Sequence, residues 1–529
     1  MDAMSKVKTL EELAETLARL REKGLRIVHC HGVFDLVHPG HIRHFEAAKR
    51  EGDVLVVTVT QDEHVNKGPG RPVFNQELRA ESVAALQIVD FVAVNQWPTA
   101  VEAITLLKPH VYVKGSEYSA PENDITGMIN HEEEALKAVG GQLHFTNEIT
   151  FSSTELLNDH FDVYPETAKI FLKELRQRYS DDAVIKQLER LRGLKVLMIG
   201  ETIIDEYHYC QALGKSPKEL LVATKFLREE VFAGGVLACA NHVAGFCQDV
   251  HLVTCLGSHQ SREAFIRAHL KPNITARFFY RDDASTIVKR RYVDPVFLAK
   301  MFEVSFIDDS DIPHDVEQEL YRYLKSVLGD YDLVLVADYG HGLMKPDIVK
   351  LLCAGSRFLA VNTQTNSANT GYNLITKYPR ADFICIDEPE IRLACHDRVN
   401  DLRELIASIA CKLGCRRAAV TWGPRGSMTY AVEDGFFEIP VFSSKIVDRT
   451  GAGDAYLSLA APCVAAGMPM DLVGFIGNAV GALAVRIVCN RSAVEPVPLY
   501  KFITALLKGS QSPPDKLKRI TNGAHSTLS

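Results

Sequence analysis

The sequence predicts two α/β domains joined by a helical connector. Its 529 residues exceed what a single hydrophobic core ordinarily holds. Short apolar runs that end in glycine-rich or acidic turns alternate with stretches of helical periodicity, both in the first third and in the C-terminal two thirds. Strands that alternate with helices form parallel, doubly wound sheets, so each part is expected to contain one.

The composition excludes several classes of protein. Hydrophobic residues make up 47% and charged residues 24%, and 59 Lys and Arg against 67 Asp and Glu give a net charge of −8, which argues against a general nucleic-acid binder. We find no apolar run of about 18 residues, and residues 1–24 read as a charged amphipathic helix rather than a signal peptide. We therefore expect no membrane partner and a cytoplasmic location. The twelve cysteines form no C-x-x-C pair and are expected to be reduced core residues.

The first candidate site lies in Leu25–His41, where an apolar strand turns at Gly32 and a helix opens with the sequence HPGH. Such a junction directs backbone N–H groups and the positive end of the helix dipole at one point, which suits a phosphate. His38 and His41 are three residues apart and share one face of the first turn. Both can donate hydrogen bonds to a phosphate during in-line displacement.

Further candidates for phosphate contacts follow in the first third. Two cations lie near predicted strand ends, Lys67 in the loop 61–71 and Lys114 after the strand 109–113, while Arg79 lies in a helix predicted over 75–86. Ser153 and Thr154 precede a helical stretch, where hydroxyls either cap the helix or bind phosphate. Beside the histidine pair we favour phosphate binding.

The string from Gly32 to His41 resembles the G-x-F-D-x-x-H-x-G-H signature of the cytidylyltransferase-like nucleotidyltransferases. With KGPGRPV, E-x-R, VKGSEY and SST, this third is similar to the adenylyltransferase half of the bifunctional heptose 7-phosphate kinases and heptose 1-phosphate adenylyltransferases. The resemblance implies a Rossmann-like sheet that binds ATP, with Mg²⁺ assisting, and a sugar 1-phosphate that attacks the α-phosphorus to release pyrophosphate. It implies catalytic roles for His38 and His41, and nucleotide contacts from Gly32, Phe34, Lys67, Arg79, Lys114, Ser153 and Thr154.

One residue departs from that pattern. His31 stands where the family usually has asparagine before the glycine, and we expect it to change how the nucleotide or the sugar sits.

The domain limits follow from the same features. Residues 1–160 are predicted to form the nucleotidyltransferase domain, and 161–193 a charged helical linker whose apolar stripe offers an interdomain or dimer contact. Residues 194–507 form the second domain, and 508–529 are a Ser-, Pro- and Gly-rich tail expected to be mobile.

The second domain carries acidic residues at successive strand ends. Asp205 follows the opening strand 195–200, Asp338 ends the strand 333–337, and Asp387 and Glu390 follow the strand 383–386. Such carboxylates can hold Mg²⁺ or sugar hydroxyls, although exposed loop acids are an equally good reading of each one alone. The pair Gly234-Gly235 permits close backbone approach to a ligand at a helix entry.

The second candidate site is the stretch Asp448–Tyr456, which reads DRTGAGDAY. Gly451, Ala452 and Gly453 would turn their N–H groups toward a transferring phosphoryl group at a helix start. Asp454, in the first helical turn, can accept the proton of an attacking sugar hydroxyl.

The string D-x-x-G-A-G-D resembles the hallmark of the ribokinase-like (PfkB) carbohydrate kinases, and the likeness extends over about 194–498. It implies a ribokinase-like doubly wound sheet with Asp454 as catalytic base. It also implies nucleotide contacts from Thr421, Gly423, Gly426, Gly451, Ala452, Gly453 and Asn478, sugar contacts from Asp205, Gly234, Gly235 and Asp338, and metal contacts from Asp387 and Glu390. Both halves thus resemble the same bifunctional enzyme family, with the usual domain order reversed.

Four departures concern the kinase-like half. Ala238-Cys239 replaces the family's asparagine after the diglycine, Asn362-Thr363-Gln364 replaces a D-P-K motif, and His341 stands where lysine is common. The family's N-x-x-E motif is recast as Asp387-Glu388-Pro389-Glu390, which keeps the glutamate. Either the sugar site has been re-specified or the kinase has weakened.

We therefore expect a two-domain enzyme of nucleotide-sugar biosynthesis. It would use ATP and Mg²⁺ to phosphorylate a sugar phosphate of the heptose 7-phosphate type, and would transfer the adenylyl group of ATP to a sugar 1-phosphate. The alternative is a cytidylyltransferase acting on a polyol or sugar phosphate, with a re-specified or non-catalytic regulatory kinase-like domain. In either case we expect a homo-oligomer, a dimer.

Overall fold

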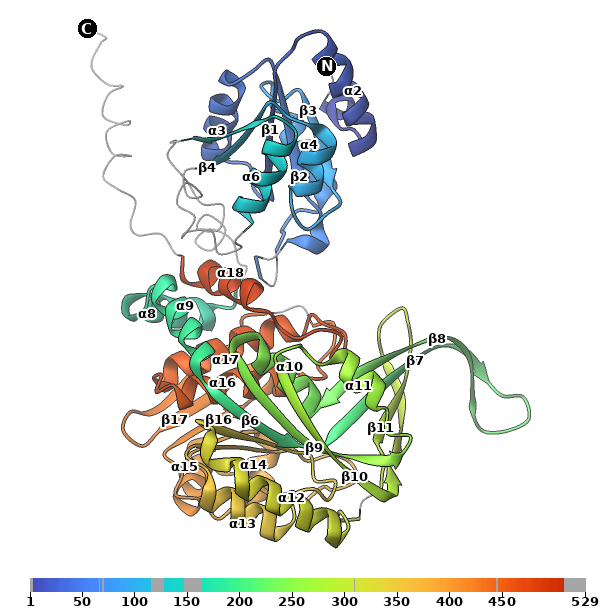
Figure 1. Ribbon diagram of the computed structural model, residues 1–529, viewed down its shortest axis with the longest axis vertical. Helices are drawn as coiled ribbons and strands as arrows, with labels where there is room; N and C mark the ends of the chain where they lie inside the picture. The colour runs from blue at the N-terminus through green and yellow to red at the C-terminus, as the bar shows by residue number, and fades with distance from the viewer. Residues whose placement is uncertain are drawn as a thin grey trace. The chain divides into compact units, whose positions relative to one another are not determined.

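The computed structural model describes residues 3–65, 67–68, 71–115, 128–146, 164–308, 310–443 and 446–508 (Figure 1). The chain divides into two compact units, one made of Met1–Pro165, Leu172–Asp181 and Tyr500–Ser529, the other of Glu166–Phe171 and Asp182–Leu499. Each contains a largely parallel sheet with helices, so the predicted class of two α/β domains is confirmed. Ser153, Thr154, Ser116–Tyr118 and the tail beyond Lys508 lie outside the described residues.

The first unit is built on a five-stranded parallel sheet in the order β3-β2-β1-β4-β5. Its strands are β1 Ile27–Gly32, β2 Val54–Thr60, β3 Phe91–Asn95, β4 Val111–Gly115 and β5 Gln142–Thr146. The order reverses between β1 and β4, and open α/β sheets bind ligands at the carboxyl ends of strands at such a point. Both Gly32 of β1 and Lys114 of β4 lie there.

Amphipathic helices cover this sheet. They are α1 Ala3–Lys6, α2 Leu10–Glu22, α3 Pro39–Arg50, α4 Gln76–Ala84, α5 Val101–Leu107 and α6 Ile129–Ala138. Helix α2 begins at a capping box formed by Thr9 and Glu12 and buries the leucines of one stripe against the sheet, Leu10, Leu13 and Leu17. Helix α3 follows β1 directly and buries Phe45 and Ala48, so its N-terminus is fixed at the end of β1.

The predicted connector is helical where the structure describes it, as α8 Glu166–Arg178 and α9 Asp181–Arg190. The final helix, α18 Pro496–Leu507, contributes its residues from Tyr500 onward to the first unit. There Arg176 donates to the carbonyl of Leu506 at 2.8 Å, and the buried ring of Phe502 lies directly on Gly68, where a Cβ would come within 2.0 Å of it.

The second unit has a nine-stranded sheet in the order β10-β9-β6-β13-β14-β15-β16-β17-β18, parallel from β10 through β16. The strands are β6 Lys195–Gly200, β9 Asp249–His259, β10 Ile274–Ser285, β13 Leu333–Asp338, β14 Leu359–Thr363, β15 Phe383–Asp387, β16 Arg417–Thr421, β17 Ser427–Ala431 and β18 Gly435–Ile439.

Helices lie on both faces of this sheet (Figure 1). One face carries α12 His314–Val327, α13 Pro346–Gly355, α14 Glu388–Cys395 and α15 Leu402–Lys412. The other carries α10 Val236–Phe246, α16 Ala452–Ala465 and α17 Met470–Ala484, which pack against one another. The short helix α11 Glu263–His269 connects β9 to β10. The candidate base, Asp454, lies in the first turn of α16.

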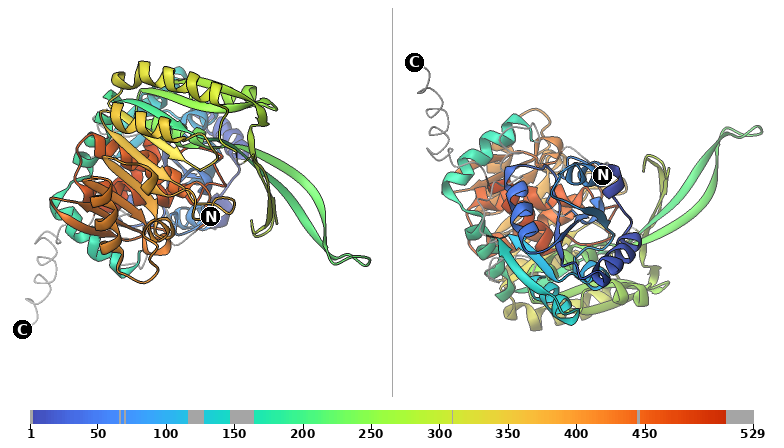
Figure 2. Two further views of the ribbon diagram at one scale, coloured as in Figure 1. Left: turned by 90° about the horizontal axis from the view of Figure 1, so that it is seen from below. Right: turned by 90° about the horizontal axis from the view of Figure 1, so that it is seen from above.

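A second, four-stranded sheet in the order β12-β11-β7-β8 belongs to the same unit. Its strands are β7 Thr202–Lys215, β8 Val222–Gly235, β11 Ile287–Val293 and β12 Lys300–Phe306. Figure 2 shows β7 and β8 extending as a long hairpin, here called the arm (residues 202–235), away from the rest of their unit. The arm exposes a group of large apolar side chains, Leu213, Leu220, Leu221, Val222, Phe226 and Leu227.

Two expectations from composition can be compared with the structure. In the described part of the chain, no helix is both long and apolar enough to cross a membrane. All twelve cysteines are free, and nine of them are buried, as expected for reduced core residues.

Candidate functional sites

The HPGH turn joins β1 to α3, and His38 is the N-cap of that helix. Its Nδ1 accepts a hydrogen bond from the backbone N–H of Gly40 at 3.1 Å. An accepting Nδ1 carries no proton, so in the neutral ring the proton resides on Nε2, which becomes a donor. Capping by a histidine therefore fixes the tautomer as well as the position of the ring.

His41 lies against His38, with ring centroids 3.9 Å apart and ring planes inclined by 24°. Burial, followed by the neighbouring His38 and Lys67, lowers the pKa of His41 to about 3. Burial and Lys67 also lower the pKa of His38. Both imidazoles are therefore neutral at pH 7 and can offer N–H donors without the cost of bringing two adjacent positive charges together.

Phe34 and Gly32 shape the same turn. Phe34 has a left-handed backbone (φ 47°) and packs edge-on against His41, with ring centroids 5.3 Å apart. A Cβ on Gly32 would lie 2.9 Å from Cζ of that ring. In this structure the two residues support the imidazole of His41, and direct nucleotide contacts from them remain a prediction.

A buried ion pair organises the loop that carries Lys67. Asp35 lies 3.4 Å from Arg71, and its carboxylate also accepts the backbone N–H groups of Val73 and Phe74 at 2.7 and 3.2 Å. Burial and the Arg71 charge lower the pKa of Lys67 to about 8, although Asp35 opposes the shift. Lys67 is thus held close to the histidine pair, whose pKa values it lowers.

Lys114 ends β4 and pairs with Glu132 of α6 at 2.8 Å. Beside it, His31 uses both ring nitrogens on hydroxyls of β2, Nδ1 at 2.9 Å from Thr58 and Nε2 at 3.3 Å from Thr60. The histidine that replaces the family's asparagine at position 31 is therefore held by hydrogen bonds to the neighbouring strand β2.

Arg79 is bonded within the protein, and its nucleotide contact remains a prediction. Its guanidinium is fully buried and donates to three backbone carbonyls, those of Phe74 at 2.9 Å, Val33 at 2.5 Å and Thr60 at 2.7 Å, and it pairs with Asp62 at 2.5 Å. These bonds join α4 to the end of β1 and to β2. Arg79 holds the loops of the site in place, because its donors are already used by the protein.

In the second unit, Gly451 caps α16 with a left-handed backbone (φ 83°), and a Cβ there would lie 2.1 Å from Oδ1 of Asn490. Ala452 is the first residue of the helix, and a Cβ on Gly453 would meet no other atom within 4 Å. The nest expected from the sequence (Gly451–Gly453) is therefore closed by Asn490 beside Gly451 and open beside Gly453. The N–H of Ala452 donates to the carbonyl of Arg449 at 3.3 Å, so the N–H groups of Gly451 and Gly453 are the candidates for an anion contact.

Asp454 follows the nest, and its Oδ1 accepts a hydrogen bond from the hydroxyl of Tyr339 at 2.9 Å. Burial raises its pKa to about 6, and Asp205 raises it too, whereas Tyr339 and Lys289 oppose the shift. A carboxylate with this pKa is ionised at pH 7 and is a stronger base than an exposed aspartate, which suits general-base work.

The diglycine faces Asp205 across the arm. A Cβ on Gly234 would lie 2.0 Å from Oδ2 of Asp205, and Gly235 turns with φ 58° into α10. The carboxylate of Asp205 also pairs with Arg291 of β11. Gly234 is thus required because any side chain would displace this carboxylate.

Two predicted contact residues of the second unit are bonded within the protein, and their ligand contacts remain predictions. Asp338 is fully buried and accepts from the hydroxyl of Tyr378 at 2.7 Å and from Lys377 at 2.5 Å, so it supports the end of β13. Asn478 donates its amide to the carbonyls of Ile439 and Pro440 at 2.8 and 3.0 Å. Its donors hold the end of β18.

The predicted metal ligands form a helix cap. Asp387 accepts from the N–H of Glu390, and Glu390 accepts from the N–H groups of Asp387 and Thr365, each at 2.8 Å. Burial and Asp387 raise the pKa of Glu390 to about 8, which disfavours the anion that Mg²⁺ requires. Among the described residues no cluster of three acidic, His or Cys side chains could hold a metal ion. These two carboxylates therefore do not fit a ready-made Mg²⁺ site.

The glycine turn near Thr421 has the predicted strand-turn form. Thr421 ends β16, Gly423 has φ 53°, and a Cβ on Gly426 would lie 2.0 Å from the carbonyl oxygen of Ile439. Their nucleotide contacts remain a prediction. Nearby, Asn362 donates to the carbonyl of Cys385 at 2.8 Å, so the motif that replaces D-P-K is used within the sheet.

Lys289 and Tyr339 were missed from the sequence. Lys289 lies on β11 opposite Asp205 and is 9% exposed; burial lowers its pKa, while Asp205, Glu303 and Asp454 oppose the shift. Lys289 therefore places a basic side chain near Asp454, in a domain where Asn362-Thr363-Gln364 replaces the lysine of the D-P-K motif. Neither residue belongs to a local motif, and the only sequence signal is a lysine within an otherwise apolar and arginine-rich strand.

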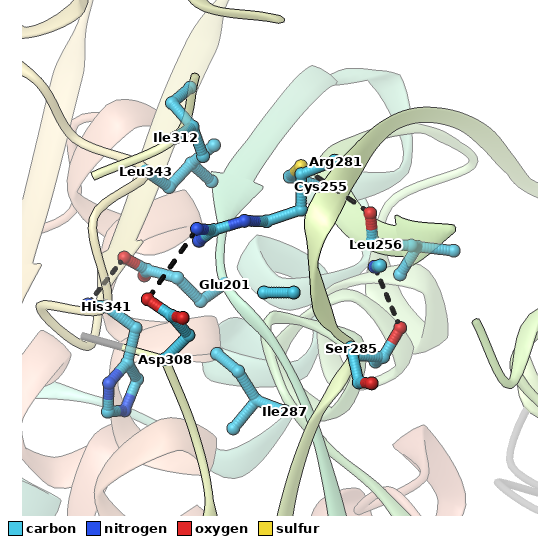
Figure 3. A pocket seen from close by; sticks show the side chains of 13 residues that line it. Glu201, Cys255, Leu256, Arg281, Ser285, Ile287, Asp308, Ile312, His341 and Leu343 are labelled. Atoms are coloured by element: carbon cyan, nitrogen blue, oxygen red, sulfur yellow. Dashed lines mark hydrogen bonds and ion pairs between the residues drawn. The ribbon is translucent and has the colours of Figure 1, made fainter. Parts of the chain in front are cut away.

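A pocket borders this region, lined by Glu201, Arg281, Asp308 and His341 among others (Figure 3). Arg281 is held by Asp283 at 2.8 Å, and the carboxylate of Glu201 accepts the backbone N–H groups of Tyr339 and His341. Because carboxylates balance its single arginine, the pocket does not favour an anion. Its function in the structure is to anchor the backbone after β13.

Two family models match the chain. Residues 194–492 match the model of the pfkB family carbohydrate kinases, and 29–158 match the cytidylyltransferase-like model. The chain therefore belongs to the pfkB carbohydrate kinase family, with a cytidylyltransferase-like domain preceding the kinase domain.

The curated relatives carry one name. The bifunctional protein HldE of Trichlorobacter lovleyi is 36% identical over 155 residues, which cover 29% of this chain and 30% of that protein. HldE of Citrifermentans bemidjiense is 23% identical over 343 residues, 64% of this chain and 68% of that protein. The chain thus spans about a third of the length of the relatives it matches with highest significance.

Among solved structures, phosphofructokinase-2 from Escherichia coli with substrates and products aligns with 60% of this chain and 100% of its own, at 11% identity and a TM-score of 0.48. A likeness of this level supports no conclusion by itself.

The contacts of Gly234 lead to a prediction. In Gly234→Ala the new methyl group would displace the Asp205 carboxylate, so we expect sugar-phosphate binding to weaken by about 10-fold or more while ATP binding is retained. Isothermal titration calorimetry with each ligand measures both. Gly481→Ala is the control, because a Cβ there meets no atom within 4 Å; equal loss in both variants would contradict this role of Gly234.

The contacts of Arg79 lead to a prediction about stability. Arg79→Met leaves buried carbonyls without donors, so the free energy of unfolding of the first unit should fall by about 3 kcal/mol. Urea unfolding followed by circular dichroism measures it. Arg50→Met, at the exposed end of α3, should change it by less than about 0.5 kcal/mol. A stable Arg79→Met protein that had lost only ATP affinity would return Arg79 to the nucleotide site.

Proposed function

We propose that the chain is a bifunctional enzyme of nucleotide-sugar biosynthesis, with one reaction in each unit. The observation that carries the proposal is a pair of separate helix starts, one with paired neutral imidazoles at α3 and the other with the half-buried Asp454 carboxylate at α16. The names of the curated relatives and the matches to both families support it.

In the kinase reaction, Asp454 accepts the proton of a sugar hydroxyl as its oxygen attacks the γ-phosphorus of ATP. The new oxygen–phosphorus bond forms, the bond to the bridging oxygen breaks, and ADP leaves. The N–H groups of the nest (Gly451–Gly453) stabilise the charge on the transferring group. We take the acceptor to be the anomeric hydroxyl of a heptose 7-phosphate, by analogy with the relatives.

In the nucleotidyltransferase reaction, a phosphate oxygen of the sugar 1-phosphate attacks the α-phosphorus of ATP and pyrophosphate leaves. His38 and His41 donate hydrogen bonds to the phosphate oxygens from neutral rings, and Lys67 adds positive charge. Mg²⁺ is expected to accompany ATP in both reactions, and neither step above depends on a protein site for it. The alternative nucleotide, CTP, is excluded if pyrophosphate forms with ATP and not with CTP.

We also propose that the arm forms a homodimer, in the cytoplasm. The exposed apolar side chains near its tip include Leu220 at 93% and Val222 at 66% exposure, and patches of this kind mark protein interfaces. The outer edges of β8 and β12 carry unpaired backbone groups that a second copy can cover.

Separate active sites make a reciprocal prediction. Asp454→Asn should lower ADP formation by about 100-fold or more and leave pyrophosphate release from a supplied sugar 1-phosphate unchanged. His41→Asn should lower pyrophosphate release and leave ADP formation unchanged. Coupled assays for ADP and pyrophosphate over a panel of sugar phosphates test both. Loss of both activities in a folded single variant would contradict two independent sites, and ATP binding without any ADP formation would favour a regulatory second unit.

The arm makes a prediction about assembly. Replacing Leu220 and Val222 together by glutamate should convert the dimer to a monomer in sedimentation velocity, since charges cannot be buried there without partners. Val399→Glu is the control, because Val399 is 90% exposed and lies outside the arm. A monomeric wild-type protein at micromolar concentration would refute the dimer.

A further inference from the structure

Tyr339 follows β13 directly, and its backbone is held from two sides. Its N–H donates to Oε2 of Glu201 at 2.9 Å. Its carbonyl accepts the side-chain amides of Asn366 and Asn369 at 3.0 and 2.7 Å. The residue therefore cannot shift without breaking three hydrogen bonds.

The side chain of Tyr339 is equally fixed. It is 1% exposed, and its hydroxyl lies 2.9 Å from Oδ1 of Asp454 and 3.6 Å from Sγ of Cys239. Because a carboxylate has no proton to give, the hydroxyl donates to Asp454. A tyrosine with a buried ring and two rotatable bonds holds its hydroxyl more firmly than a longer flexible donor would.

The orientation of Asp454 matters for the proton transfer. A general base must present one oxygen within hydrogen-bond distance of the hydroxyl that it deprotonates. The bond from Tyr339 occupies Oδ1 and fixes the rotation of the carboxylate, which leaves Oδ2 for the sugar hydroxyl.

Several charged or titratable groups face Asp454 from other elements. Asp205 of β7 disfavours its anion and Lys289 of β11 favours it, while Cys239 of α10 and Cys385 of β15 are neutral thiols whose pKa values burial raises. Among the described residues, Tyr339 is the one of these groups that bonds directly to the carboxylate.

We propose that Tyr339 is a positioning residue for the base Asp454, orienting its carboxylate and stabilising its ionised form. The inference rests on the proposed kinase function. It adds a residue that no local motif marks, contributed from the end of a different strand.

In Tyr339→Phe the ring stays and only the hydrogen bond is lost. We expect kcat for ADP formation to fall by about 10-fold with KM for the sugar phosphate nearly unchanged. Without the donor the ionised carboxylate is less favoured, so the pKa of Asp454 rises above about 6. The acid limb of the pH–rate profile should therefore move to higher pH, by about one unit.

Tyr378→Phe is the matched control. Tyr378 is also 1% exposed, and its hydroxyl donates to another buried carboxylate, Asp338, at 2.7 Å. This variant removes a hydroxyl of the same kind away from the base, so the acid limb should stay where it is in the wild type. An equal shift in both variants would mean that Tyr339 acts only through stability, and would overturn the proposal.

A readout without turnover separates this inference from the proposed function. In protein labelled with ¹³C at aspartate carboxyls, Asp454→Asn identifies the resonance of residue 454, which is then titrated in wild type and in Tyr339→Phe. An unchanged titration overturns the positioning role. A shifted titration in a protein that forms no ADP from any sugar phosphate supports the role and refutes the kinase.

A second variant covers the case in which Tyr339→Phe does not fold. With 3-fluorotyrosine at position 339 the shape is kept and the hydroxyl becomes a stronger donor. The acid limb should then move to lower pH, and a limb that does not move would count against the proposal.

Discussion

The second unit depends on a half-buried carboxylate that has to ionise near neutral pH. Asp454 lies at the start of α16, where desolvation is the largest cause of a pKa raised to about 6. The hydroxyl of Tyr339 and the charge of Lys289 offset that cost, from β13 and β11 respectively. The adjacent Asp205 works against them, and its own pairing with Arg291 limits the effect. The two sheets of the unit must therefore meet at this point for the base to function.

In the first unit, two adjacent imidazoles are kept neutral. Placing two imidazolium ions 3.9 Å apart beside a lysine would be costly, and burial keeps both rings uncharged. His38 gives up one ring nitrogen to cap α3, which leaves the other as a donor. The positive charge beside the two rings then comes from Lys67 and from the helix N-terminus.

Local patterns predicted the fold class, the junction of β1 with α3 and the helical connector. They also placed a strand directly before the helix of Asp454, but β18 ends at Ile439 and α16 begins only at Ala452. Local patterns do not show a side chain's partner that lies far away in the chain. Arg79 and Asn478 look like ligand contacts by type, but their donors are taken by backbone carbonyls of distant strands. Asp387 and Glu390 have the spacing of metal ligands and equally that of a capping box, which is what they form. Tyr339 and Lys289 were missed because only tertiary packing brings them to Asp454.

The three-segment composition of the first unit has a consequence for how the protein is made. Phe502 lies on the backbone of Gly68, and Leu506 accepts from Arg176, so residues near the end of the chain complete a unit that begins at its start. A ribosome releases the nucleotidyltransferase sheet first and this last helix only after the whole kinase domain has emerged. Throughout that interval the backbone at Gly68 lacks its aromatic cover, so a nascent chain stalled before α18 would leave this loop of the first unit open to water.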